Sequence, residues 1–168
     1  MTMNSIVFQL MALLESETHL YQALLGLILE ERNAIIDSDL EKFDAVGQKR
    51  ENLYQKLRMS EDQRMRILTQ LSRITGCPSS ELTLSRLSRR LPLSYADRLN
   101  ECRRNLSRLL EKIQKATRHN RGLINHSLAL IRGSVYLFGD LLAAKPLYHR
   151  NGDIKKSNRT GALLRNDA

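Results

Sequence analysis

Residues 94–142 read SYADRLNECRRNLSRLLEKIQKATRHNRGLINHSLALIRGSVYLFGDLL, and their spacing decides the fold. Apolar and small residues recur there in alternating steps of three and four over six heptads, which is typical of the seam of an antiparallel coiled coil. At about 1.5 Å per residue, this last helix is expected to be roughly 70 Å long. The seam positions are Leu99, Cys102, Leu106, Leu109, Ile113, Ala116, Asn120, Leu123, Ser127, Leu130, Ser134 and Leu137.

The seam changes character after Ala116, because three of its later positions are Asn120, Ser127 and Ser134. The neighbouring row of the helix becomes apolar there, so the apolar stripe widens and turns away from the line of an internal partner. We therefore predict a partner-binding face on residues 120–142, with Asn120 fixing the register. Burial of its apolar residues would contribute on the order of 10–20 kcal/mol before the cost of association. These residues are Leu123, Ile124, Leu128, Ile131, Val135, Phe138 and Leu142.

The rest of the chain predicts further helices and an all-α fold. Helical spacing covers residues 5–36 and resumes over residues 40–74. The joint Asp37-Ser38-Asp39 offers N-cap side chains, which leaves a sharp hairpin open. Because the joint has neither Gly nor Pro, a continuous or slightly bent helix is expected across it. Gly76 and Pro78 end the second segment, and a short connecting helix through Leu82–Leu91 stops at Pro92.

The expected organisation is one antiparallel helical domain over residues 1–143, with the last long helix over 93–142. Residues 144–168 are basic and punctuated by Gly, which predicts a flexible, disordered tail.

Charge is distributed unevenly along the chain, whose formal net charge is +9. Residues 1–63 sum to −5, residues 64–121 to +10 and residues 122–168 to +4. A basic middle is compatible with binding to nucleic acid or to anionic lipid. The simpler interpretation is that basic helices lie against the acidic first helix, or present a solvated face, and need no outside partner.

The sequence argues against an enzyme, a metal site and a membrane protein. It has no Gly-rich phosphate loop, no metal-binding helix motif and no nucleophile elbow, and its four histidines do not cluster with carboxylates. Cys77 and Cys102 fit reduced thiols. No signal peptide or membrane span is recognised. We expect a cytoplasmic protein without a cofactor.

The chain resembles the FlgN-type flagellar export chaperones across most of its length. Residues 13–57, LLESETHLYQALLGLILEERNAIIDSDLEKFDAVGQKRENLYQKL, look like their long helical pair. The stretch HNRGLINHSLALI at 119–131 is similar to the opening of their partner-binding helix, and PLYHRNGDI at 146–154 to the Leu-Tyr-x-x-x-Gly element that follows it. The resemblance is weakest over residues 76–92.

The resemblance implies a chaperone for the hook–filament junction proteins FlgK and FlgL. It implies that the C-terminal amphipathic segment holds a helical end of the substrate, prevents premature assembly and delivers it to the export gate protein FlhA. Tyr148 would contact the gate. Two alternatives stay open: a coiled-coil scaffold that self-associates, for example as a homodimer, through the same face, and a basic helical protein that binds nucleic acid.

Overall fold

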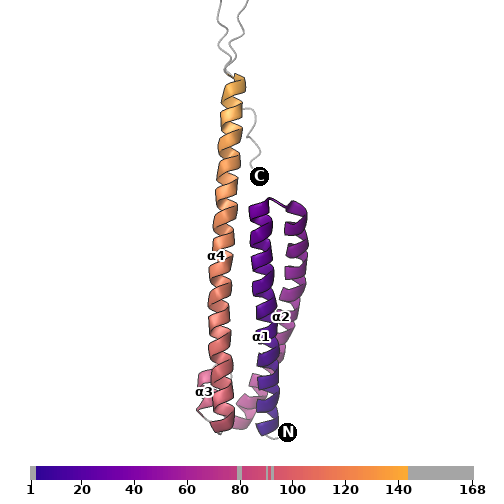
Figure 1. Ribbon diagram of the computed structural model, residues 1–168. Helices are drawn as coiled ribbons and strands as arrows, with labels where there is room; N and C mark the ends of the chain where they lie inside the picture. The colour runs from indigo at the N-terminus through magenta and orange to yellow at the C-terminus, as the bar shows by residue number, and fades with distance from the viewer. Residues whose placement is uncertain (1–2, 79–80, 90, 92, 144–168) are drawn as a thin grey trace, which may run out of the picture. The chain divides into compact units, whose positions relative to one another are not determined.

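The computed structural model describes residues 3–78, 81–89, 91 and 93–143 and contains four helices (Figure 1). They are α1 (Met3–Asp37), α2 (Leu40–Thr75), α3 (Leu84–Ser88) and α4 (Leu93–Ala143). No strand occurs among the described residues, so the prediction of an all-α fold is confirmed. The chain divides into two compact units, Met1–Ile124 and Asn125–Ala168, with the boundary inside α4. The predicted tail, 144–168, lies outside the described residues.

A tight turn separates α1 from α2, and the prediction of a continuous or slightly bent helix there is wrong. The two helices pack against each other along their length. Ser38 has a φ of 55°, in the left-handed region that usually favours Gly. The Asp39 carboxylate accepts a hydrogen bond from the Lys42 N–H at 2.9 Å, and the Asp39 N–H donates to the Ala34 carbonyl. The N-cap bond of Asp39 and the left-handed conformation of Ser38 thus form the turn without Gly or Pro.

The break after α2 agrees with the sequence. Gly76 has a φ of 68° and forms the left-handed C-cap of α2. Thr83 caps α3 by accepting a hydrogen bond from the Arg86 N–H at 3.2 Å. α3 is shorter than predicted, because Leu82 and Leu91 lie outside it.

Two hydrophobic clusters hold the first unit together. The larger joins the start of α1 to the end of α2, to the α3 region and to the first turns of α4; it contains Ile6, Val7, Leu10, Met11, Leu14, Leu71, Leu82, Leu87, Leu99 and Leu106. The smaller consists of Leu24, Ile28, Leu53 and Ala116. Burial of the predicted seam of α4 is therefore confirmed over its first half. It ends near Leu123, since Leu130 and Leu137 are both 60% exposed. The antiparallel neighbour is α2, because the pairs Glu15–Arg98 and Ile28–Asn120 show that α4 runs parallel to α1.

Candidate protein-binding face

Every side chain described between residues 125 and 140 is exposed. Seven of these side chains are large and apolar, which is unusual for so short a stretch of surface. Their exposed fractions run from 45% for Leu128 to 63% for Phe138. The seven are Leu128, Leu130, Ile131, Val135, Tyr136, Leu137 and Phe138.

Helical spacing arranges six of the seven in two rows. The first row, Leu128, Ile131, Val135 and Phe138, follows steps of three and four residues, and the second row contains Leu130 and Leu137. Ser127 and Ser134 lie between the rows. The Ser134 hydroxyl donates to the Leu130 carbonyl at 3.0 Å, so it makes its hydrogen bond within its own helix. Two apolar ridges flanking a strip of small residues form a surface into which the ridge of another helix can pack.

Leu123 and Ile124 are both half-buried, in contrast to the exposed rows, and they belong to the first unit. They mark the position on α4 at which burial gives way to exposure. Of the residues predicted from sequence for the binding face, the structure thus places Leu128, Ile131, Val135 and Phe138 fully on the surface and these two at its edge. The side chain of Leu142 lies outside the described residues.

Asn120 is buried, with 2% of its surface exposed, and its amide is engaged within the first unit. The Nδ2 group donates to the Ile28 carbonyl at 2.8 Å and to a Glu31 carboxylate oxygen at 2.9 Å. Arg32 Nε donates to Oδ1 at 3.4 Å, and Arg50 of α2 pairs with the other oxygen of Glu31. Asn120 therefore links α4 to α1 and, through Glu31, to α2. In this arrangement it is not available to a partner.

Sequence reasoning missed three exposed apolar residues, two of them in the rows and one outside them. Leu130 and Leu137 were assigned to the internal seam, and Tyr136 was not assigned at all. The helix lengths could have indicated this exposure. α4 has 51 residues, whereas α1 has 35 and α2 has 36, so neither can cover α4 from end to end. Seam positions in the last part of α4 are thus open to solvent. Tyr148, the predicted gate contact, lies outside the described residues.

The first unit also contains a buried carboxylate, at Glu17 of α1. Burial raises its pKa above the usual value; the nearby Arg64 guanidinium and a hydrogen bond from the Ser60 hydroxyl oppose that rise, and Glu61 adds to it. Ser60 Oγ lies 3.2 Å and Arg64 Nε 3.5 Å from Glu17 Oε1. This cluster joins α1 to α2 and has no nucleophile or metal-ligand geometry, so we interpret it as structural.

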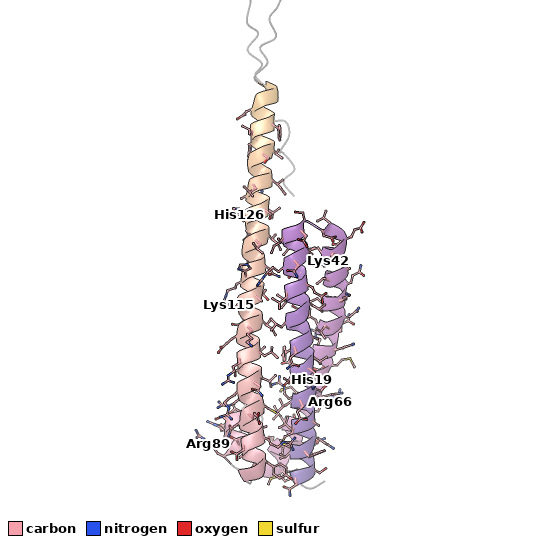
Figure 2. The ribbon with its side chains drawn as sticks, in the orientation of Figure 1. His19, Lys42, Arg66, Arg89, Lys115 and His126 are labelled. Atoms are coloured by element: carbon pink, nitrogen blue, oxygen red, sulfur yellow. The ribbon has the colours of Figure 1, made fainter. Side chains whose placement is uncertain are left out.

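Other kinds of site find no support in the described part of the chain. It holds no group of three or more His, Cys, Asp or Glu side chains that could bind a metal ion. His19, on α1, and His126, on α4, are both exposed (Figure 2). Within the described ranges, no helix combines the length and apolarity needed to cross a membrane. The exposed apolar rows remain the most distinctive surface feature.

Comparison with known families gives a match to the FlgN protein family over residues 1–156. The chain belongs to the FlgN family. This is a family of flagellar export chaperones rather than of enzymes, and the resemblance noted in the sequence is confirmed. Comparisons with curated proteins and with solved structures gave no match. In this FlgN-family chain, the exposed rows of α4 lie within the matched region.

Proposed function

We propose that this protein is a cytoplasmic export chaperone for the hook–filament junction proteins FlgK and FlgL. It binds a helical segment of either substrate on the apolar rows of α4 and so prevents premature assembly. The observation that carries this proposal is the uninterrupted exposure of residues 125–140, with seven large apolar side chains among them. Family membership supports the export role but does not identify the substrates.

The exposed area is large enough for a reversible complex. Complete burial of a large apolar side chain is worth about 1.5–3 kcal/mol, so side chains that are 45–63% exposed can each gain roughly 1–2 kcal/mol. The six that form the rows give on the order of 10 kcal/mol, and the matching surface of the partner contributes a similar amount. Association costs roughly 4–15 kcal/mol. The remainder is compatible with a dissociation constant of about 1 μM or below.

Delivery to the export gate is the second part of the proposal. By resemblance to the family, the tail contacts FlhA, and Tyr148 is the residue that matches the family's tail tyrosine. Because Tyr148 lies beyond the apolar rows in sequence, substrate binding and gate docking use different segments. The variant Tyr148→Ala is expected to co-purify with FlgK and FlgL as the wild type does, while secretion of both proteins falls. Normal secretion by this variant would remove Tyr148 from the mechanism.

The test of substrate binding compares the full chain with one that ends at Ile124, the last residue of the first unit. Both hydrophobic clusters lie within the shorter chain, so it is expected to remain helical by circular dichroism. It should no longer co-purify with FlgK or FlgL. Full retention of binding by the folded, shortened chain would place the site elsewhere.

The alternative cover for the apolar rows is a second copy of the chain. Light scattering across a range of concentrations distinguishes a second copy of the chain from a substrate protein as the partner that covers the rows. A chaperone of the proposed type stays monomeric until substrate is added. A scaffold forms concentration-dependent dimers that do not dissociate when substrate is added.

A further inference from the structure

A second surface, on the part of α4 that belongs to the first unit, carries a concentration of positive charge. Residues 103–121 contain seven Arg or Lys residues and a single acid, Glu111. All seven basic side chains are exposed. Their helical spacing places Arg104, Arg108, Lys115 and Arg118 on the side of α4 opposite the buried seam, and the other three on its flanks. The seven extend over about 27 Å of helix. We name this set the basic face: Arg103, Arg104, Arg108, Lys112, Lys115, Arg118 and Arg121.

The acidic first helix does not neutralise the basic face, contrary to the first of the two simpler interpretations of the sequence. Among the ion pairs of the described residues, α4 contributes only Arg98, which pairs with Glu15 of α1 at 2.9 Å. The buried acids of α1 take their partners from α2 instead: Glu17 pairs with Arg64, and Glu31 with Arg50. No ion pair of the described residues includes a member of the basic face.

We propose that the basic face docks the chaperone reversibly onto the anionic surface of a phospholipid bilayer. Basic side chains next to such a surface are attracted by its negative potential, and each strengthens binding by about five-fold at physiological ionic strength. Seven together can raise the partition coefficient by on the order of 10⁴, even if the flanking residues contribute less. The one large apolar side chain exposed within residues 103–121 is Leu110, at 39%. Binding is therefore expected to be mainly electrostatic and to weaken steeply with salt.

The shape and composition of the face favour a lipid surface over the other polyanions. Single-stranded nucleic acid is usually held by aromatic stacking, and residues 103–121 contain no Phe, Tyr or Trp. An acidic peptide is normally held in a groove. Lys112 and Lys115 border a shallow hollow between α1 and α4. The basic face as a whole is nevertheless centred on the convex back of one helix. An extended, laterally mobile array of headgroups can meet the four central residues, Arg104, Arg108, Lys115 and Arg118, without fixed geometry.

The test uses the full chain and sedimentation with vesicles of equal parts phosphatidylglycerol and phosphatidylcholine, against vesicles of phosphatidylcholine alone. One variant reverses four charges of the basic face, Arg104→Glu, Arg108→Glu, Lys115→Glu and Arg118→Glu. The matched control reverses four exposed charges of α2, Lys42→Glu, Lys49→Glu, Lys56→Glu and Arg66→Glu; Lys115, Lys42 and Arg66 are labelled in Figure 2. Both variants have the same net charge, so the comparison isolates position.

The proposal expects wild-type protein to sediment with the anionic vesicles but not with the neutral ones, and to be released as salt is raised. The basic-face variant should bind at least about 100-fold more weakly, while the α2 variant loses less than a factor of ten. Absence of binding to anionic vesicles at low salt would overturn the proposal. An equal loss in both variants, or tighter binding to duplex DNA than to the vesicles, would overturn it as well. Because the apolar rows are untouched, FlgK and FlgL binding by both variants reports separately on the proposed function.

Discussion

Replacing two residues of the first apolar row is expected to weaken substrate binding while leaving the chaperone itself unchanged. Ile131 is 59% exposed and Phe138 63% exposed, so a partner can bury about three-fifths of the surface of each residue. With 1.5–3 kcal/mol for complete burial, each contributes roughly 1–2 kcal/mol, and the pair roughly 2–4 kcal/mol. The double variant Ile131→Ser/Phe138→Ser should therefore bind FlgK and FlgL about 30- to 700-fold more weakly.

Serine is a suitable replacement because its helix propensity is close to those of Ile and Phe, so the helix is retained. Isothermal titration with purified FlgK and FlgL measures the affinity, and thermal denaturation followed by circular dichroism measures stability. The control is Phe8→Ser/Ile36→Ser, which removes the same residue types from α1 at exposed fractions of 60% and 62%. An affinity loss below about three-fold, or an equal loss in the control, would refute the assignment of the site to this row.

Three further substitutions test the packing of the first unit. Asn120→Ala removes the donor to Ile28 and Glu31 and should lower the free energy of unfolding by about 1–3 kcal/mol in urea denaturation, whereas Asn125→Ala, at an exposed position, should change it by less than about 0.5 kcal/mol. The raised pKa of Glu17 means that the folded state binds more protons than the unfolded state above pH 4.5, so stability falls as pH rises through the folded pKa. Glu17→Gln should flatten that fall in melting temperatures measured from pH 4.5 to 7. An unchanged slope would contradict the assignment of this pH dependence to Glu17. In the same urea assay, Gly76→Ala should destabilise the protein by about 1 kcal/mol because Gly76 has a positive φ. Gly47→Ala should stabilise it by about 0.5–1 kcal/mol, because Gly47 lies in a helix interior and an added Cβ would meet open space.

The helices could be predicted from the sequence because spacing of three and four residues records burial on one side of a helix. That logic located the ends of α2 and the buried half of α4 correctly, including Leu99, Leu106 and Ala116. It failed at the α1–α2 turn, because Ser38 adopts a left-handed backbone conformation that its residue type does not predict. Periodicity indicates that a residue faces a partner, but it does not indicate how the chain changes direction.

The candidate site was predicted in part for a related reason. An apolar row looks the same in sequence whether it is covered by the same chain or by another protein, which is why Leu130 and Leu137 were assigned to the internal seam. Asn120 was assigned to the partner because a polar residue in a seam often fixes register. It does occupy a seam, but its hydrogen-bond partners, Ile28 and Glu31, lie about ninety residues earlier in the chain, and pairing over that separation is not visible in local sequence.

The central claim is that the apolar rows of α4 are open in the free protein and covered in the complex. Solvent labelling at a single introduced cysteine tests it most directly, and Val135, 59% exposed in the middle of the first row, is the position to use. The variant Val135→Cys should react with a maleimide at close to the rate of an unhindered thiol, as followed on its own peptide by mass spectrometry. Saturating FlgK or FlgL should slow that reaction at least about ten-fold. A thiol that reacts slowly in the protein alone, or at the same rate with and without substrate, would contradict the account.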